Sequence, residues 1–366
     1  MKIVTVFGTR PEAIKMCPLV LELKKDPQID THVCVTGQHR EMLDQVLEIF
    51  NVIPDSDLSI MKDRQTLTSI TTSVLTKIEA VLASVKPDIV LVHGDTTTSM
   101  AAAMAAFYQQ IPVGHVEAGL RTYDIYSPFP EEMNRKLISA LSTFHFAPTI
   151  TNEKALLDEG ISKNIYITGN TVIDAFQYTT DTNYHFKCEA LNKIDFNKPT
   201  ILMTAHRREN LGEPLLNICS AVKELCKLHP QLQFVYPVHL NPAVRETVFK
   251  ELDKHPQIYL IDPIDVQDMH NAMQRSFVIL TDSGGMQEEA PHLGKPVVVL
   301  RTETERPEAV AANTAVVAGV EKDNIVGIVD KIISDNATYK AMSSASNPFG
   351  DGKASQRIVQ ILKEQL

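Results

Sequence analysis

Short apolar, β-branched runs alternate with longer amphipathic segments along most of the 366 residues. Several short runs are apolar throughout, such as 89–92 (Ile-Val-Leu-Val) and 297–300 (Val-Val-Val-Leu), which is typical of strands buried on both faces of a parallel sheet. The alternation predicts repeated strand–helix–strand units and an α/β fold. We expect strands at 2–7, 31–36, 88–92, 112–116, 144–147, 165–167, 199–204, 232–236, 257–260, 277–280, 296–299 and 314–316. Among the helices we expect 12–25, 66–85, 96–108, 212–228 and 322–333.

The periodicity is weakest in a polar stretch at 181–198, just before Pro199 and a new apolar run. This stretch divides the pattern into two doubly wound domains of about six strands each, and 366 residues are too many for one average core. Ligands of open α/β sheets bind beyond the carboxyl ends of the strands. We therefore expect the active site in a cleft where two such edges face each other.

Composition narrows the classes of function. The net charge of −10 argues against a nucleic-acid or membrane-surface partner but allows a local positive pocket. No segment is apolar for long enough to span a bilayer, and the apolar run at 3–7 is too short for a signal peptide, so we expect a cytoplasmic protein. Five cysteines without a CxxC pair are expected to be reduced, and the histidines lack metal-ligand spacing. The segment 350–355 is similar to a P-loop, but Lys353 is not followed by Ser or Thr.

The first motif directly follows the first strand. Gly8 permits a tight turn, and Pro11 suits the first position of the next helix. Arg10 then stands beside a helix N-terminus, where anions are favoured and where its planar guanidinium can bind two phosphate oxygens. The alternative is an ordinary strand-to-helix turn with a solvated arginine.

Acidic residues follow the strands farther along the first half. Asp95 and Glu117 each come after a buried strand, and adjacent parallel strands would bring them to the same edge of the sheet. Glu131 or Glu132 opens another helix and would add a third acid. Convergent acids are what proton transfer at carbon requires. Alternatively, Asp95 caps the helix at 96–108, and the glutamates only complement a helix dipole.

The second half offers groups for a nucleoside diphosphate. His206 and Arg207, with Arg208, end its first strand, and this cluster suits a diphosphate unless it is a surface group paired with nearby glutamates. Ser283, Gly284 and Gly285 follow a later strand, where bare backbone amides at a helix start can approach phosphate oxygens. Glu289 lies about one and a half turns farther on and can accept both hydroxyls of a ribose. The alternative there is a helix cap with exposed glutamates.

Six motifs in this order resemble those of the bacterial non-hydrolysing UDP-N-acetylglucosamine 2-epimerases, and the likeness extends from the first strand to residues 347–352. The motifs are 8–12 (Gly-Thr-Arg-Pro-Glu), 93–95 (His-Gly-Asp), 115–119 (His-Val-Glu-Ala-Gly), 128–132 (Pro-Phe-Pro-Glu-Glu), 206–210 (His-Arg-Arg-Glu-Asn) and 281–285 (Thr-Asp-Ser-Gly-Gly).

The resemblance implies a GT-B fold of two Rossmann-like domains and a homodimer. It moves the domain boundary, giving domains at 1–170 and 171–352 and a C-terminal helix at about 353–366 that joins the first domain. It further implies interconversion of UDP-N-acetylglucosamine (UDP-GlcNAc) and UDP-N-acetylmannosamine (UDP-ManNAc), with neither metal nor nicotinamide, to supply ManNAc for a cell-surface polysaccharide such as capsule.

The same resemblance assigns roles by matching position. UDP would leave C1 to give 2-acetamidoglucal and then add back, with the proton delivered to the other face of C2. Asp95, Glu117 and Glu131 would serve the hexosamine and its proton transfers, and His206 would assist departure of the β-phosphate. The residues implied to bind substrate are Arg10, Lys15, Arg207, Ser283, Gly284, Gly285 and Glu289. A second, allosteric UDP-GlcNAc site is implied at Gln38, His39, Arg64, Glu131, Arg207 and His239. The negative charge of Glu41, close to Gln38 and His39 in the sequence, would weaken the binding of a second diphosphate at this site.

Three other functions fit the nucleotide half. A hydrolysing 2-epimerase would release free ManNAc, and a GT-B glycosyltransferase would pass the sugar to an acceptor. A regulatory module would keep the UDP site without catalysis. The acids of the first half argue against the last two.

Overall fold

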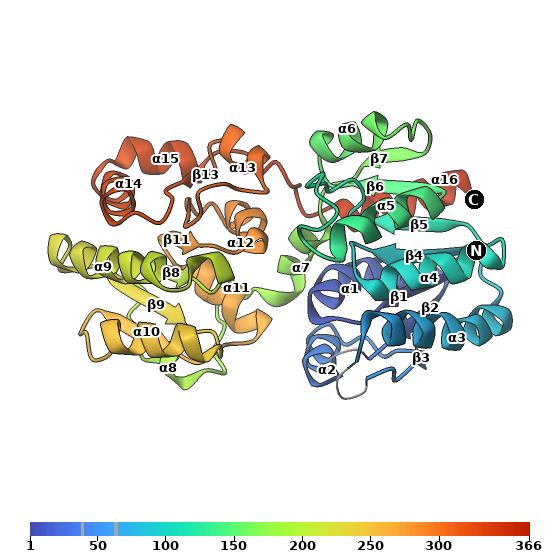
Figure 1. Cartoon of the computed structure of the whole chain (residues 1–366), viewed down its shortest axis with the longest axis horizontal. Helices are drawn as coiled ribbons and strands as arrows, with labels where there is room; N and C mark the ends of the chain where they lie inside the picture. Colours follow the sequence, from blue (N-terminus) through green and yellow to red (C-terminus); the bar gives the residue numbers. More distant parts are fainter. Residues whose placement is uncertain (38–39, 62–64) are drawn as a thin grey trace. The chain divides into compact units, whose positions relative to one another are not determined.

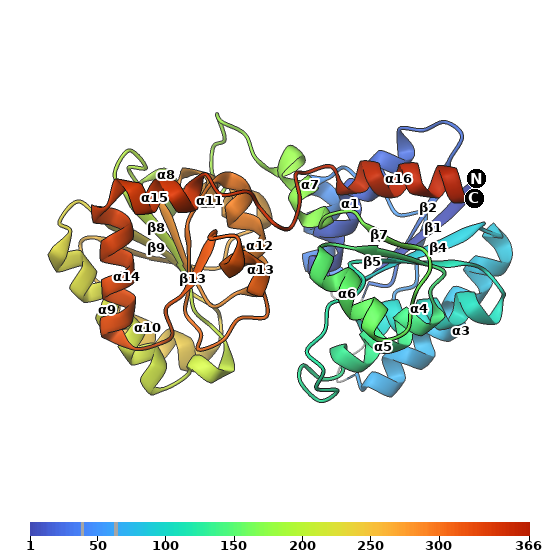
Figure 2. The same ribbon diagram turned by 90° about the horizontal axis from the view of Figure 1, so that it is seen from above.

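The computed structural model describes residues 1–37, 40–61 and 65–366. The chain divides into two compact units, residues 1–178 with 349–366 and residues 179–348. Each unit is a parallel sheet with helices on both faces (Figures 1 and 2). This is the doubly wound α/β class that the sequence predicts.

The first unit has a seven-stranded sheet in the order β3-β2-β1-β4-β5-β6-β7. The strands are β1 (Lys2–Phe7), β2 (Asp30–Val35), β3 (Ser56–Asp57), β4 (Ile89–His93), β5 (Val113–Val116), β6 (Phe144–Ala147) and β7 (Ile165–Ile167). The helices are α1 (Arg10–Lys24), α2 (Arg40–Ile49), α3 (Leu67–Val85), α4 (Thr97–Tyr108), α5 (Glu131–Leu141), α6 (Ile150–Asp158), α7 (Thr171–Thr179) and α16 (Ala354–Gln365).

The core of this unit lies on both sides of the sheet. Side chains of α1, α2 and α16 form one apolar cluster with β1 and β2, and side chains of α3 and α4 form another with β4. Strand β4 is buried along its whole length, which explains its continuous apolar run. Burying each such side chain contributes about 1.5–3 kcal/mol.

The C-terminal helix α16 packs along α1, far from it in sequence (Figure 2). Its first amides, those of Ala354 and Ser355, donate to the buried carboxylate of Asp174 on α7 at 3.1 and 2.7 Å. Asp174 thus caps α16 from another helix. Because α7 packs with the first unit, that unit extends to Tyr178, eight residues beyond the boundary we expect at residue 170.

The second unit has a six-stranded sheet in the order β10-β9-β8-β11-β12-β13. The strands are β8 (Thr200–Thr204), β9 (Gln233–Pro237), β10 (Ile258–Ile261), β11 (Val278–Thr281), β12 (Val297–Val299) and β13 (Ala315–Val317). The helices are α8 (Glu189–Asn192), α9 (Glu213–Leu228), α10 (Pro242–Leu252), α11 (Val266–Arg275), α12 (Gly284–Glu289), α13 (Pro307–Ala311), α14 (Lys322–Ser334) and α15 (Asn336–Ser343), with 3₁₀ turns η1 (Arg208–Asn210) and η2 (Ala290–Leu293).

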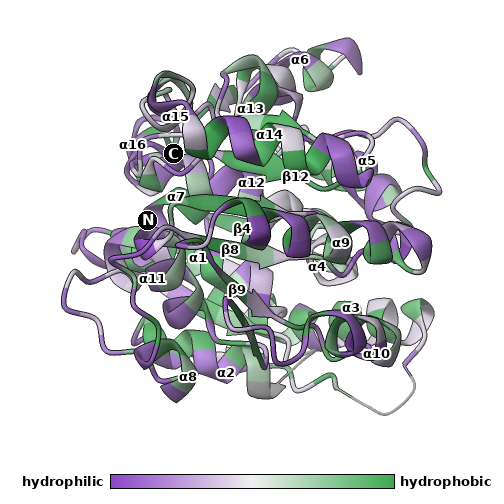
Figure 3. Cartoon of the chain, turned by 90° about the vertical axis from the view of Figure 1, so that its left-hand side faces the viewer, coloured by the Kyte–Doolittle hydropathy of each residue, from purple (hydrophilic) through white to green (hydrophobic). Residues whose placement is uncertain are grey.

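Figure 3 shows hydrophobic strands β8, β9 and β12 in this unit, while α9 and α14 carry both hydrophilic and hydrophobic residues. The apolar side chains of α9, α10 and α14 pack on one face of the sheet. Both sheets reverse their strand order, at β1/β4 in the first unit and at β8/β11 in the second. Such switch points are where open α/β sheets bind ligands.

Candidate functional site

The turn after β1 is held by a buried carboxylate. Thr9 caps α1, and the Glu12 side chain turns back to accept the amides of Gly8 and Thr9 at 2.9 and 2.8 Å. This reciprocal arrangement is a capping box, and it fixes the backbone from which Arg10 projects. We expect Pro11 at the first position of this helix. The helix instead begins at Arg10, so Pro11 takes its second position.

Glu12 also joins this turn to the one after β4. Its second oxygen accepts the Thr96 hydroxyl at 2.6 Å and lies 3.0 Å from the Ser99 hydroxyl. Thr96 is the residue that caps α4. The two loops at the β1/β4 switch point are therefore held together by one side chain that is only 2% exposed.

Glu117 follows β5 and is surrounded by nitrogen donors. Its carboxylate forms an ion pair with Lys15, accepts the Asn170 side-chain amide at 3.1 Å and lies 3.5 Å from His93 Nε2. Burial alone raises the pKa of Glu117, but Lys15 and His93 outweigh burial and hold the pKa well below its usual range. Glu117 is therefore held in its ionised form.

The backbone around Glu117 is tightly constrained. Glu117 has a left-handed conformation with φ 64°, and Gly94, after the neighbouring strand, has φ 62°. A Cβ atom on Gly94 would lie 3.9 Å from Oε1 of Glu117, so the two turns meet at this carboxylate. The register of β4 and β5, with His93 opposite Val116, produces this meeting.

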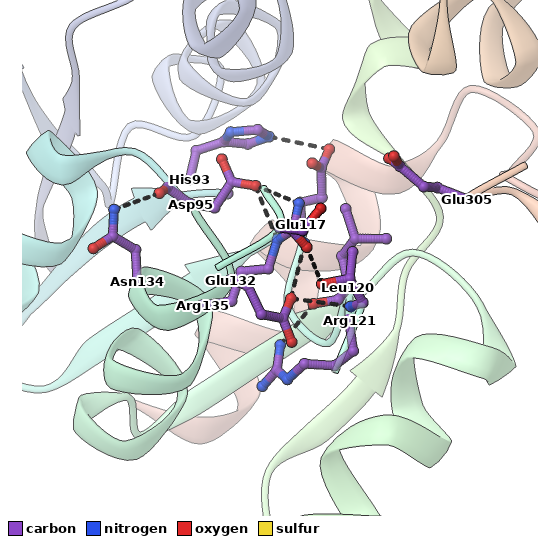
Figure 4. Close-up of polar contacts among 12 residues, drawn as sticks. His93, Asp95, Glu117, Leu120, Arg121, Glu132, Asn134, Arg135 and Glu305 are labelled. Atoms are coloured by element: carbon purple, nitrogen blue, oxygen red, sulfur yellow. Dashed lines mark hydrogen bonds and ion pairs between the residues drawn. The ribbon is translucent and has the colours of Figure 1, made fainter. Parts of the chain in front are cut away.

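Asp95 belongs to the same sheet edge, as the sequence predicts. It does not cap α4, because Thr96 does. Its Oδ2 instead accepts Nε and Nη2 of Arg135 on α5 at 2.9 and 2.7 Å, and its main-chain oxygen accepts the Asn134 side-chain amide at 2.9 Å. Figure 4 shows these contacts beside Glu117.

The structure separates the two glutamates that open α5. Glu132 is fully buried and accepts the amides of Thr122 and Tyr123, at 3.0 and 3.1 Å, and Nη1 of Arg135 at 3.0 Å. In contrast, Oε2 of Glu131 is buried without a hydrogen-bond partner among the described residues. Glu132 thus holds the loop, and Glu131 is the glutamate left for a ligand.

In the second unit, Asp282 organises the turn after β8. Its Oδ2 accepts the main-chain amides of His206 and Arg207 at 2.7 and 2.8 Å and the Asn210 side-chain amide at 3.0 Å. Its Oδ1 is buried, makes no hydrogen bond within the part of the chain that the structure describes, and lies 3.9 Å from Nε2 of His206. The His206 ring stacks on His239 at 5.2 Å between centroids. Burial lowers the pKa of His206, Asp282 raises it, and His239 and Arg207 lower it further, so the net shift is downward.

Two arginines flank the glycine turn after β11. Ser283 occupies the N-cap position of α12 but makes no capping bond. A Cβ atom on Gly284 would lie 3.8 Å from Nη2 of Arg306 and 3.9 Å from Nη2 of Arg207. Arg306 is itself paired with the buried Glu288. Two guanidinium groups beside an open glycine are well suited to a diphosphate.

An acid lies among the arginines of this cluster. Glu305 is 3.4 Å from Arg301 and 4.0 Å from both Arg207 and Arg306. Burial raises the pKa of Glu305, but the three arginines outweigh it and lower the pKa below its usual value. The arginine cluster therefore binds one negatively charged group, the carboxylate of Glu305.

Glu289 ends α12 and is supported from α11. Its Oε2 lies 3.5 Å from Nε2 of His270, whose Nδ1 is 2.7 Å from the Thr179 hydroxyl. A Cβ atom on Gly285 would lie 3.2 Å from Oε1 of Glu289, so the glycine leaves room for this carboxylate.

The described residues contain neither a candidate metal site nor a helix that could cross a membrane. Within 1–37, 40–61 and 65–366, no group of three or more His, Cys, Asp or Glu side chains is arranged to hold a metal ion. In the same part of the chain, no helix is both long and apolar enough to cross a membrane.

Comparison with known proteins agrees with this geometry. The family model described as UDP-N-acetylglucosamine 2-epimerase matches residues 21–363. The UDP-N-acetylglucosamine 2-epimerase of Bacillus subtilis is 54% identical over 363 residues, covering 99% of this chain and 95% of the relative. The chain belongs to the UDP-N-acetylglucosamine 2-epimerase family. The resemblance drawn from the six motifs is thereby confirmed.

Solved structures support both the family and the fold. The UDP-GlcNAc 2-epimerase of Neisseria meningitidis, solved with UDP-GlcNAc bound, matches with a TM-score of 0.90 and 50% identity over 100% of both chains. The kitacinnamycin glycotransferase matches with a TM-score of 0.68 at 12% identity, covering 100% of this chain and 99% of its own, which concerns the fold alone. The predicted GT-B fold is confirmed.

For this member of the 2-epimerase family, the structure brings the predicted residues together within each unit. Lys15, Asp95 and Glu117 meet at one sheet edge, and Arg207 lies beside Gly284 in the other unit. His239 lies against His206, whereas Gln38, His39 and Arg64 lie outside the described residues.

The sequence analysis assigns no role to several residues of this candidate site. They are Glu12, Arg135, His270, Asp282 and Arg306. The Thr-x-x-Glu spacing at 9–12 was a visible signal of a capping box. The other four residues contact side chains or main-chain atoms of segments far away in the sequence, so the spacing of residues could not predict these contacts.

Proposed function

We propose that this chain interconverts UDP-GlcNAc and UDP-ManNAc without hydrolysis. The observation that carries the proposal is the grouping of an ionised, cation-paired Glu117 with Asp95 at one sheet edge, with Glu131 opening the helix whose Arg135 binds Asp95. Membership of the 2-epimerase family supplies the substrate, as in the Neisseria enzyme solved with UDP-GlcNAc. The ManNAc product would serve a cell-surface polysaccharide such as capsule.

The chemistry demands more than one proton-transfer group. The C2 proton of the sugar is not next to a carbonyl carbon, so it becomes acidic only as UDP leaves C1. Elimination gives 2-acetamidoglucal, and re-addition of UDP with protonation from the other face inverts C2. Asp95, Glu117 and Glu131 are the groups that we assign to these transfers, since proton transfer on two faces requires two positioned groups.

UDP must stay bound while it is detached from the sugar. Arg10 and Lys15 in the first unit, with Arg207 in the second, supply positive charge for this. Amides at Ser283, Gly284 and Gly285 would add hydrogen bonds, and Glu289 would accept the ribose hydroxyls. Stabilising a developing phosphate charge is commonly the largest catalytic contribution.

His206 is assigned to the departing β-phosphate. Its pKa is lowered by burial, and the ring is 37% exposed, so it can reach a ligand and give or take a proton. Asp282 fixes the backbone that carries it.

A product assay tests the proposal against its rivals. Purified protein with UDP-GlcNAc should give UDP-ManNAc, with no free ManNAc and no dependence on an added acceptor. Free ManNAc would favour a hydrolysing epimerase, and acceptor-dependent release of UDP would favour a glycosyltransferase. Asp95→Asn, Glu117→Gln and His206→Ala should each abolish most turnover, and three fully active variants would refute the assignments.

Allostery and assembly are part of the proposal. A second UDP-GlcNAc would bind at a site that includes Gln38, His39, Arg64 and His239, and the protein would be a homodimer. UDP-ManNAc turnover should therefore be stimulated by UDP-GlcNAc. Hyperbolic, unstimulated kinetics would remove the second site, and a monomer in sedimentation would remove the dimer.

A further inference from the structure

We propose that Arg135 is a positioning residue for the C2 chemistry. It holds the Asp95 carboxylate and, through Glu132, fixes the segment that carries Glu131. This inference rests on the proposed epimerase function and deepens it. It assigns a role to an arginine that would act on two of the three acids without contacting substrate.

The geometry of the guanidinium is the first argument. Nε and Nη2 of Arg135 donate to Oδ2 of Asp95 at 2.9 and 2.7 Å, and Nη1 donates to Oε2 of Glu132 at 3.0 Å. The side chain is 7% exposed. A planar fork can bridge two carboxylates in this way, and a lysine ammonium on its flexible stem cannot reproduce the arrangement.

The division of the Asp95 oxygens is the second argument. Among the described residues, the hydrogen bonds and ion pairs of this carboxylate all use Oδ2, and 24% of the side chain is exposed. Oδ1 is therefore the oxygen that remains to face a ligand. By binding Oδ2, Arg135 sets the direction in which Oδ1 points (Figure 4).

The Glu132 contacts are the third argument. This fully buried carboxylate also accepts the amides of Thr122 and Tyr123, and Tyr123 has a left-handed φ of 64°. The segment between β5 and α5 is thus bound to the same guanidinium that binds Asp95. Glu131 is the next residue to Glu132, so its position depends on this contact as well.

Charge makes the arrangement sensitive. Asp95 and Glu132 bring two negative charges to one positive charge in a largely buried place. Removing the cation leaves two carboxylates facing each other, and such removal is far more damaging than loss of an exposed pair. A displacement of about 1 Å in a reacting group can cost roughly 100-fold in rate.

Variants of Arg135 and Asp95 test the proposal by turnover, UDP affinity and melting temperature. For Arg135→Gln we expect kcat to fall about 100-fold, with the Kd of UDP within about threefold of wild type. Arg135→Lys keeps the charge and should recover about tenfold of the loss. The double variant Asp95→Asn/Arg135→Gln should lose less than the product of the two single losses, because residues that act through one another are not additive.

The matched control is Arg357→Gln. Arg357 forms a two-pronged pair with Asp351 in the same unit, at 2.8 Å for both bonds, and bonds neither Asp95 nor Glu132 among the described residues. The kcat of the Arg357→Gln variant should equal that of wild type. If Arg135→Gln does not fold, the Lys variant decides: a partial kcat loss at unchanged UDP affinity supports the proposal.

Three results would overturn it. They are wild-type kcat in Arg135→Gln, equal loss of kcat and UDP affinity in the Lys variant, and multiplying losses in the double variant. An inactive wild-type protein would instead refute the proposed function and this inference together, whereas an active Arg135→Gln protein refutes the inference alone.

Discussion

The carboxylate of Glu12 allows two substitutions at one position to be distinguished quantitatively. One oxygen accepts the amides of Gly8 and Thr9, and the other faces the hydroxyls of Thr96 and Ser99. A glutamine can keep its oxygen on the two amides and donate its NH₂ group to the hydroxyls, which rotate to accept. An alanine offers the amides no acceptor.

The magnitudes follow from these contacts. A buried donor left without an acceptor costs about 1–3 kcal/mol, so Glu12→Ala should lower the free energy of local opening by about 3–5 kcal/mol. Glu12→Gln loses only the extra strength of charge-assisted bonds and should cost about 1 kcal/mol. The difference between the two variants is the quantity that tests the geometry.

Hydrogen exchange followed by mass spectrometry is the suitable assay. The chain has no tryptophan to report unfolding, and two units need not unfold in one step. Amides of β1 and α1 should lose protection in Glu12→Ala, while those of β8 in the second unit serve as the internal reference. Equal loss of protection in the Gln and Ala variants, or none in either, would refute the reasoning.

Three more predictions follow from the site and its support. Asp282→Asn should lower the pKa of His206 further, since Asp282 raises that pKa, and NMR titration of the ring would show this as a shift to lower pH. Burial lowers the pKa of His115 to about 3 and that of His145 to about 4, so the unfolded chain binds protons that the folded chain does not. The contribution of each histidine to the free energy of unfolding should therefore be full above the ordinary pKa of about 6.5 and fall by about 2 kcal/mol between pH 7 and 5. A free energy of unfolding in urea that does not change with pH over this range would contradict the burial of both rings in neutral form. Gly119→Ala would place a Cβ 2.2 Å from the Asn152 carbonyl oxygen at φ 89° and should cost about 3 kcal/mol or more, while the helical Gly327→Ala, with open space around it, should stabilise by about 0.5–1 kcal/mol in thermal melts.

The fold was largely predictable because strands buried in a parallel sheet have continuous apolar runs in their sequence. All twelve expected strands are present within a residue or so at each end. Strand β3 is not among the expected strands, because it consists of only two polar residues, Ser56 and Asp57, and is too short to show any periodicity. The polar stretch at 181–198 lies close to the division after Tyr178, whereas the resemblance places the boundary at residue 170, before α7, whose Asp174 caps the C-terminal helix.

The site was predictable where chemistry follows strand order. Asp95 and Glu117 come after neighbouring strands, so parallel register alone brings them together. Spacing could not show which acids are already bound. Glu132 and Asp282 look like candidates for catalysis, yet their oxygens accept amides from other segments and hold loops. Arg306 meets Arg207 only because the strands preceding them lie in one sheet.

The central claim is that C2 is inverted through loss and return of its proton while UDP is retained. NMR of the purified protein with UDP-GlcNAc in deuterated water measures this directly. We predict UDP-ManNAc that carries deuterium at C2 and remains linked to UDP. UDP-ManNAc that kept protium at C2, or deuterated ManNAc released as the free sugar, would contradict the account.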